Sequence, residues 1–178
     1  MSADVTVPDV TDLVDRTVPV VADWPEPGVQ FRDISPLLAD PQAFATVADA
    51  MAQATGEVDL VLGVEARGFL FGLAVAERLG VGFVPVRKAG KLPGSTESVS
   101  YDLEYGSATI EVPSGAVAPG QRVAVVDDVL ATGGTLAATV ELARRCGGEV
   151  VSAVVLIEIE ALGGRAVLDV PLAALRTY

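Results

Sequence analysis

The chain has 178 residues, 51% of them hydrophobic, and this length and composition suit one domain with a well-buried core. Its 24 acidic and 12 basic residues leave a net charge of −12, which argues against nucleic acid or an anionic membrane as a partner. Histidine is absent from the chain, which excludes Ser–His and Cys–His catalysis and metal binding through imidazole.

The sequence also bears on the compartment. No apolar run is long enough to span a membrane, and residues 1–6 lack the basic and apolar regions of a signal peptide. Cys146 is the only cysteine, so no disulfide can form within the chain. These features together predict a cytoplasmic protein.

The first third of the chain predicts two helices with a rigid turn between them. Residues 10–17 carry apolar side chains at helical spacing, residues 24–28 form the turn, and residues 29–34 predict a short extended segment. The second helix is expected over residues 41–56, because Asp40 is a favourable N-cap and proline is tolerated at the first helical position.

Strands and helices then alternate along the chain. Residues 59–64 and 81–86 are apolar runs typical of buried strands, and residues 69–79 between them have a helical pattern. Further strands are expected over residues 150–159 and 172–178. Crossover units of this kind predict an α/β fold, with a parallel sheet and helices on both faces.

Residues 88–112 interrupt the alternation. Two segments with alternating polarity flank Glu104-Tyr-Gly106 and predict a hairpin, which has little core of its own and is therefore a candidate for a flexible lid. Arg87, Lys88 and Lys91 lie at its start and include both lysines of the chain. Such a cationic cluster in an acidic protein suits an anionic substrate, although it would also suit a solvated loop.

The most informative stretch joins a predicted strand at residues 123–126 to a predicted helix that Gly147 and Gly148 end. The crossing between them, Asp127–Thr135, is polar and rich in glycine. In an α/β sheet, ligands bind where a strand passes into a helix. This crossing is therefore the expected binding site.

The residues of the crossing suit a phosphate next to a pair of hydroxyls. The helix N-terminus favours an anion, Gly133-Gly134 allows the backbone to approach it, and Thr132 and Thr135 add hydroxyl donors. Asp127-Asp128 can accept hydrogen bonds from vicinal hydroxyls or hold a hydrated Mg²⁺. These features describe a site for a ribose 5-phosphate. The lysine of a P-loop and the spacing of a dinucleotide fingerprint are missing, which weakens the hypothesis of an NTPase or a sugar-phosphate isomerase.

Residues 125–135 resemble the motif with which type I phosphoribosyltransferases bind 5-phosphoribosyl 1-pyrophosphate (PRPP). Residues 27–36, 63–72, 86–94 and 101–106 extend the resemblance, which runs from about residue 25 to the C-terminus, to family members that use adenine. The resemblance implies a single phosphoribosyltransferase domain over residues 1–178. Residues 1–36 would form an N-terminal helix and a small base-binding hood, and residues 88–112 the lid.

The resemblance further implies the reaction. Adenine and PRPP would give AMP and pyrophosphate with the help of Mg²⁺, as a step of purine salvage. In the family, some pyrophosphate contacts come across a dimer interface, so a homodimer is implied. Glu104 in the lid would be the catalytic residue that handles a proton on the purine. Without the resemblance, Glu104 would be taken as an exposed hairpin carboxylate.

The remaining site residues follow from the same resemblance, position by position. The ribose 5-phosphate is expected at Asp127, Asp128, Ala131, Thr132, Gly133, Gly134 and Thr135, with Mg²⁺ carried by PRPP near Asp127. The pyrophosphate is expected at Glu65, Ala66, Arg67, Arg87, Lys88 and Lys91. The base is expected at Gln30, Phe31, Arg32 and Ile159.

Two alternative functions remain at this point. One is a phosphoribosyltransferase for another purine base, because Gln30 stands where an apolar residue is expected. The other is a non-catalytic regulator that binds PRPP, but such regulators carry a helix-turn-helix or a basic surface, and this sequence shows neither.

Overall fold

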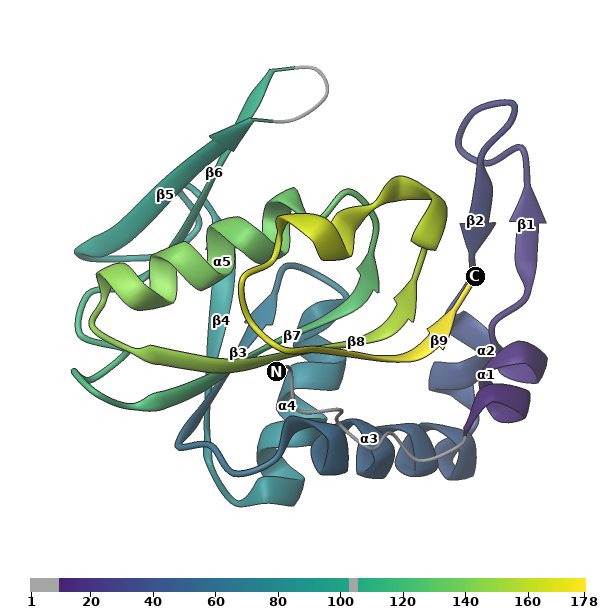
Figure 1. Ribbon diagram of the computed structural model, residues 1–178, viewed down its shortest axis with the longest axis horizontal. Coiled ribbons are helices and arrows are strands. Elements are labelled where there is room, and N and C mark those ends of the chain that lie inside the picture. The colour runs from purple at the N-terminus through teal and green to yellow at the C-terminus, as the bar shows by residue number, and fades with distance from the viewer. Residues whose placement is uncertain (1–9, 103–105) are drawn as a thin grey trace.

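The computed structural model describes residues 10–102 and 106–178, and within them seven strands form one mixed sheet in the order β5-β6-β4-β3-β7-β8-β9 (Figure 1). The strands are β3 (Leu60–Val64), β4 (Gly82–Lys88), β5 (Thr96–Asp102), β6 (Ser107–Pro113), β7 (Arg122–Leu130), β8 (Glu149–Glu158) and β9 (Leu172–Thr177). Strands β4, β3, β7, β8 and β9 pair in parallel, whereas β6 pairs antiparallel with β4 and β5. The mostly parallel sheet confirms the predicted α/β class.

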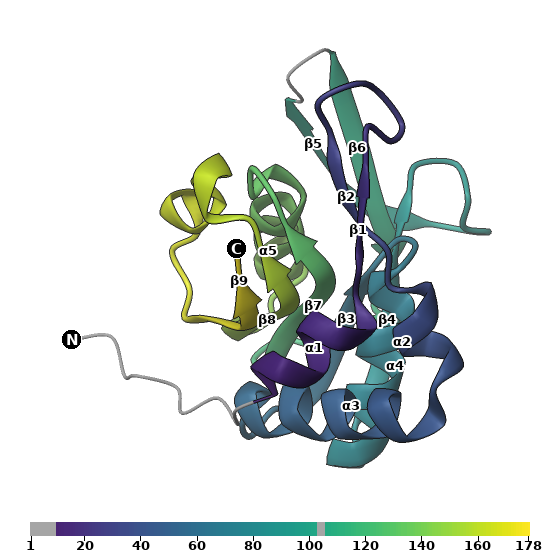
Figure 2. The same ribbon diagram turned by 90° about the vertical axis from the view of Figure 1, so that its right-hand side faces the viewer.

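Helices cover both faces of the sheet (Figures 1 and 2). They are α1 (Thr11–Thr17), α2 (Ser35–Ala39), α3 (Pro41–Thr55), α4 (Gly68–Leu79) and α5 (Gly134–Arg145), with short 3-10 helices η1 (Glu160–Leu162) and η2 (Gly164–Val167). Successive side chains of one strand pack on opposite faces of the sheet: Val126 packs in the core with α3 and α4, and Val125 packs in the core with α5. Strands buried on both faces explain the continuous apolar runs of the sequence. No helix of the described residues is both long and apolar enough to cross a bilayer.

Local signals placed most helix ends correctly. The side chain of Asp40 accepts hydrogen bonds from the N–H groups of Gln42 and Ala43, both at 3.0 Å, and α3 starts at Pro41. The helix stops before Gly56, which adopts a φ of +73°. The expected N-cap and glycine stop are therefore confirmed.

The N-terminal segment forms an antiparallel hairpin of β1 (Val20–Ala22) and β2 (Gln30–Arg32). The sequence pattern predicts an extended segment at β2 but neither β1 nor the short helix α2. Three-residue strands are too short to show an alternating pattern, so only their pairing reveals them. The ring of Trp24 meets that of Phe31 edge to face, with 4.4 Å between the centroids, and joins the turn to β2.

The expected hairpin at residues 88–112 exists, but its base has a core. Val99, Ile110 and Val112 are buried, and β6 continues the central sheet beside β4. The paired ends of β5 and β6 farthest from this base rise on the same side of the molecule as the β1–β2 hairpin (Figure 1). Glu104 lies outside the described residues.

Strand β7 is longer than the sequence suggested. Its pairing with β8 continues to Leu130, so that Asp127 and Asp128 belong to the strand and not to the crossing. Helix α5 already begins at Gly134. The loop itself is therefore short, residues 131–133, because backbone pairing with β8 holds the polar residues that precede it.

Candidate functional site

The site lies at the carboxyl ends of β3 and β7, which are neighbours in the sheet. The chain continues from β3 to β4 on one side and returns in β7 on the other side of β3, so the strand order reverses at this place. Such switch points open a crevice between the loops. The start of α4 touches β7 here, since a Cβ on Gly68 would lie 2.7 Å from Oδ1 of Asp127.

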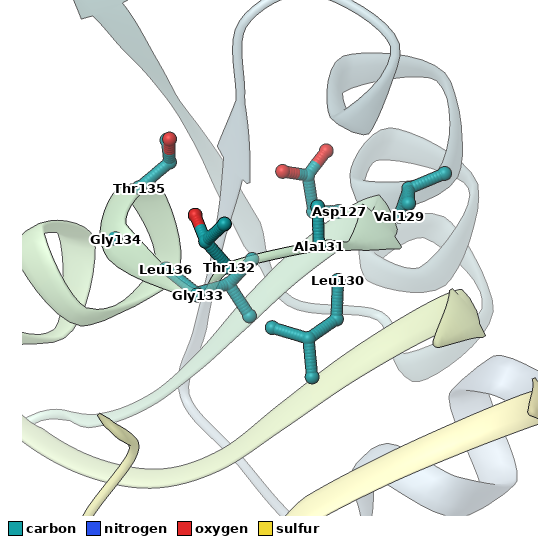
Figure 3. Close-up of a pocket in the computed structure, with 9 residues that line it drawn as sticks. All are labelled: Asp127, Val129, Leu130, Ala131, Thr132, Gly133, Gly134, Thr135 and Leu136. Atoms are coloured by element: carbon teal, nitrogen blue, oxygen red, sulfur yellow. The ribbon is translucent and has the colours of Figure 1, made fainter. Parts of the chain in front are cut away.

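The loop after β7 and the first turn of α5 form a small pocket. We call residues 131–135 the phosphate loop, and with Asp127, Val129, Leu130 and Leu136 they line this pocket. Figure 3 shows the side-chain oxygens of Asp127, Thr132 and Thr135 on the same side of the loop. Gly133 has a φ of +84°, a conformation that favours glycine and turns the chain into α5. The helix N-terminus thus faces a polar pocket that suits an anion.

The two aspartates beside this pocket are buried and close together. Burial raises the pKa of Asp127, and the neighbouring Asp128 carboxylate raises it further. Oδ1 of Asp127 accepts a hydrogen bond from the N–H of Asp128 at 2.8 Å. Oδ2 of Asp128 lies 2.9 Å from Nε of Arg67 without a hydrogen bond from any described residue, so this contact is ionic only. The oxygen keeps its capacity to accept a ligand hydroxyl.

Arg67 joins three predicted parts of the site. It follows β3 in residues 65–67, which we call the pyrophosphate loop because the sequence predicts that they bind pyrophosphate. Arg67 pairs with Asp128, and its guanidinium lies 5.4 Å from the ring centroid of Phe31. The sequence separation between these residues is large, and only the fold brings them together. The contacts of Arg67 therefore bring the segment after β3 next to Phe31, which is expected to bind the base, and next to Asp128, which is expected to bind the ribose.

The cationic cluster is organised by Glu65. Its carboxylate accepts hydrogen bonds from Nζ of Lys91 at 2.6 Å, from the backbone N–H of Lys88 at 2.9 Å, and from Nε of Arg87 at 3.1 Å. Burial would raise the pKa of Glu65, but these hydrogen bonds outweigh it and lower the pKa to about 2. The Glu65 carboxylate therefore holds the side chains of Arg87 and Lys91 in place, and the contact of Glu65 with a pyrophosphate stays a prediction.

Two residues that hold the loops of the site were not predicted from the sequence. Glu111 is buried on β6 and accepts hydrogen bonds from the backbone N–H groups of Lys91 and Leu92, both at 3.1 Å. The hydroxyl groups of Tyr101 and Thr135 lie 3.0 Å apart and link β5 to the phosphate loop. Both Glu111 and Tyr101 sit in an alternating strand pattern, which gives no signal that distinguishes them from surface residues.

The expected base-binding residues lie on two segments, β2 and the residue that follows β8. Phe31 lies on β2 beside Arg67, and Gln30 is exposed on the same strand. The guanidinium of Arg32 stacks on the ring of Tyr178, 3.3 Å from its centroid. Ile159 follows β8, where its N–H donates to the carbonyl of Leu130 at 2.9 Å. Their contacts with a base stay a prediction.

We expect Glu65→Gln to change how stability depends on pH. Because the folded pKa of about 2 lies below the ordinary value of 4.5, Glu65 contributes stability fully above pH 4.5 and loses it as pH falls towards 2. The difference in unfolding free energy between wild type and Glu65→Gln should therefore shrink over this range in urea titrations. Glu57, which is 98% exposed, provides the control Glu57→Gln. A difference for Glu65→Gln that stays constant with pH would contradict the assignment.

Comparison with known proteins places the chain among nucleotide-forming enzymes. Residues 33–168 match the model of the phosphoribosyl transferase domain. An adenine phosphoribosyltransferase of Thermobifida fusca is 58% identical over 172 residues, which cover 95% of this chain and 98% of that protein.

Two solved structures are similar over most of the chain. The adenine phosphoribosyltransferase of Thermoanaerobacter pseudethanolicus has a TM-score of 0.91 and 45% identity, and the match covers 94% of this chain and 99% of that one. The Saccharomyces cerevisiae enzyme, in complex with adenine and an imino-altritol bisphosphate, has a TM-score of 0.87 and 37% identity, with coverage of 92% and 97%.

Proposed function

Because this chain belongs to the phosphoribosyl transferase family, we propose that it transfers the phosphoribosyl group of PRPP to adenine in purine salvage. AMP and pyrophosphate are the products. The relatives named above carry this activity in their names, and the yeast structure holds adenine. The observation that carries the proposal is the position of Asp127 and Asp128 at the phosphate loop, with Arg67, which follows β3, paired to Asp128.

Each part of the crevice then has a task in the reaction. The phosphate loop holds the 5-phosphate, and Asp127 and Asp128 accept hydrogen bonds from the ribose hydroxyls. The bond between C1 of the ribose and the pyrophosphate breaks, and the pyrophosphate leaves with the bonding electrons. N9 of adenine forms the new bond to C1, and the base loses the proton of its imidazole ring. Arg67, Arg87 and the two lysines stabilise the negative charge that develops on the pyrophosphate.

One assay tests the proposal directly. Purified protein is given PRPP and one purine or pyrimidine base at a time, and nucleotide and pyrophosphate are measured. We expect AMP from adenine and little product from the other bases. Product from hypoxanthine or guanine instead would support the alternative of a different purine substrate. Binding of PRPP without any product would support the non-catalytic regulator.

Glu104 remains our proposal for the residue that handles the purine proton, on the resemblance alone. In a chain without histidine, a carboxylate is one of the few groups able to do this. The substitution Glu104→Gln keeps the shape and loses the basicity, so near-normal turnover of that variant would remove Glu104 from the mechanism.

We propose that Mg²⁺ arrives with PRPP and not as a resident metal of the protein. Among the described residues no cluster of three or more acidic, cysteine or histidine side chains could hold a metal ion. Mg²⁺ commonly keeps several waters and binds through substrate phosphates and one or two carboxylates, which suits Asp127 beside the phosphate loop. When bound, the ion neutralises charge on the leaving pyrophosphate.

We therefore expect EDTA to abolish turnover and added Mg²⁺ to restore it. AMP lacks the pyrophosphate, so its affinity, measured by calorimetry, should change little with EDTA. Equal loss of AMP binding and turnover would indicate a structural metal instead.

We propose that a second copy of the chain covers the apolar face of α4. Leu70 and Leu73 are 45% and 58% exposed, on a helix that begins directly after the pyrophosphate loop. Apolar side chains line a groove along this face: Leu38, Phe44, Phe69, Leu70, Leu73 and Phe83. An exposed apolar patch of this kind marks an interface, and its continuity with Arg67 lets a partner copy approach the site.

Leu73→Glu should accordingly convert a dimer into a monomer, because a dimer would bury the new charge. Sedimentation velocity gives the mass, and turnover should fall together with it. A wild-type protein that sediments as a monomer at all concentrations would contradict the proposal.

We also propose the cytoplasm as the compartment. Cys146 cannot form a disulfide within the chain, which suits a reducing environment. Cell fractionation with the protein recovered outside the cytoplasm would contradict this.

A further inference from the structure

An ion pair between a buried glutamate and a half-exposed arginine lies beside the site, and the proposed function assigns it no role. Glu158 ends β8, and its side chain is 6% exposed. Arg165 in η2 donates from Nε to Oε1 of Glu158 at 3.0 Å and from Nη2 to Oε2. The hydroxyl of Thr177 also donates to Oε2, at 3.4 Å. A buried carboxylate with this many donors is held in one position.

The same arginine reaches a second strand. Nη1 of Arg165 donates to the backbone carbonyl of Leu172, the first residue of β9, at 2.9 Å. Arg165 therefore spans the end of β8 and the start of β9. Because both strands belong to the central sheet, these hydrogen bonds attach η2 to the sheet at two points.

Helix η2 in turn lies directly against the back of the phosphate loop. A Cβ on Gly164 would stand 2.2 Å from the carbonyl oxygen of Ala131 and 2.9 Å from the N of Gly133. Conversely, a Cβ on Gly133 would stand 2.5 Å from the carbonyl oxygen of Gly164. Both positions thus allow only glycine, and the two backbones meet without intervening side chains.

This close contact matters because backbone N–H groups of the loop bind the phosphate. Their position decides the length and angle of each hydrogen bond, and small displacements weaken such bonds steeply. The loop between β7 and α5 has only three residues, so it cannot keep its shape if η2, against which it packs, shifts. The position of η2 therefore determines the shape of the phosphate site.

We propose that Glu158, Arg165 and Gly164 are positioning residues for the 5-phosphate. The ion pair fixes η2 to the sheet. Gly164 of η2 packs against the backbone of Ala131 and Gly133 and thereby determines where these two residues lie. The inference rests on the proposed function, because it requires that the phosphate loop binds the 5-phosphate of PRPP and AMP.

The substitution Gly164→Ala tests the contact. The added methyl group would displace the loop, so we expect the affinity for AMP and for ribose 5-phosphate to fall about tenfold to a hundredfold, the loss of one charge-assisted hydrogen bond. The KM for PRPP should rise by a similar factor. Pyrophosphate contacts other residues and should bind as it does to wild type in calorimetry.

Gly163→Ala is the matched control. Gly163 adopts a φ of +66°, and a methyl group added there would find nothing within 4 Å, so alanine strains the backbone without touching the loop. The control should lose thermal stability and bind AMP like wild type. If Gly164→Ala binds AMP like wild type, the inference is overturned. If wild type itself binds no AMP, the proposed function fails and the inference with it.

The ion pair is tested by a variant and its rescue. Arg165→Ala leaves a buried charge unpaired and should lower both the melting temperature and the affinity for AMP. Adding Glu158→Gln removes this charge, so the melting temperature should recover in the double variant. The affinity for AMP should stay low, because η2 is still detached. Recovery of both together would show a merely structural role and overturn the proposal.

Discussion

Replacing Asp127 and Asp128 together by asparagine is expected to abolish most of the affinity for PRPP while leaving the fold intact. Each carboxylate would accept a hydrogen bond from a ribose hydroxyl, and bonds to charged groups contribute about 1.5–3 kcal/mol each. The two losses together correspond to a decrease in affinity of about a hundredfold to ten-thousandfold. Calorimetric titration with PRPP in the presence of Mg²⁺ measures this decrease.

The same substitution should not destabilise the protein much. Burial and the neighbouring carboxylate raise the pKa of Asp127, so its ionised form is disfavoured in the folded state. A group whose folded pKa is raised contributes stability only at low pH and loses it as pH rises through that pKa. Asparagine at position 127 therefore removes a group whose charged form is disfavoured in the folded state. The substitution at position 128 also removes the ionic contact with Arg67, and this loss lowers the stability of the fold.

A surface carboxylate supplies the control for this experiment. Asp49 on α3 is 69% exposed and pairs with Arg78, away from the crevice. Asp49→Asn should bind PRPP with unchanged affinity. Unchanged affinity in the double variant at 127 and 128 would show that these carboxylates do not hold the ribose.

The second large effect concerns the choice of base. We expect the specificity constant for adenine to exceed that for hypoxanthine by about a thousandfold or more, because a site built for one hydrogen-bonding pattern rejects the other. Adenine presents an amino donor at position 6 and an acceptor at N1, and hypoxanthine presents the reverse pattern. Competition between the two bases at equal concentration measures the ratio, and comparable specificity constants would contradict the preference for adenine.

The β1–β2 hairpin shows how the backbone could read this pattern. The N–H of Asp23 donates to Val29 at 2.8 Å, and the N–H of Asp33 donates to Pro19 at 3.0 Å. Because hydrogen-bonded and non-hydrogen-bonded pairs alternate in an antiparallel ladder, Gln30 and Arg32 turn their N–H and C=O groups away from β1. These edge groups can accept from the amino group and donate to N1.

The side chains around this edge do not supply the opposite pattern. A site for 6-oxopurines needs a donor at position 6, and no lysine occurs between Leu92 and Tyr178. Arg32 is another possible donor to the base, but in the structure its guanidinium stacks on Tyr178. The side chain of Gln30 is exposed. Gln30→Val should therefore keep the ratio between adenine and hypoxanthine, whatever its effect on turnover.

The sequence by itself was sufficient for most of the longer helices and strands and for locating the polar connection between β7 and α5. Hydrophobic runs identified β3, β4 and β8, and Asp40 with Pro41 identified the start of α3, because each signal lies within a few residues of the feature it specifies. The polar residues from 127 to 135 likewise lie in one continuous stretch, from the end of β7 to the start of α5. Local chemistry of this kind needs no knowledge of the remaining chain.

The tertiary structure alone decided the contacts between segments. Hydrogen bonding to β8 extended β7 through both aspartates, and pairing across a turn created β1. Arg67 meets Asp128, and Gly164 meets Ala131, only because the parallel sheet brings the ends of distant strands to one edge. A sequence pattern reports which face of its own element a residue occupies. It does not report the register of the neighbouring strand, and that register determines which residues share the site.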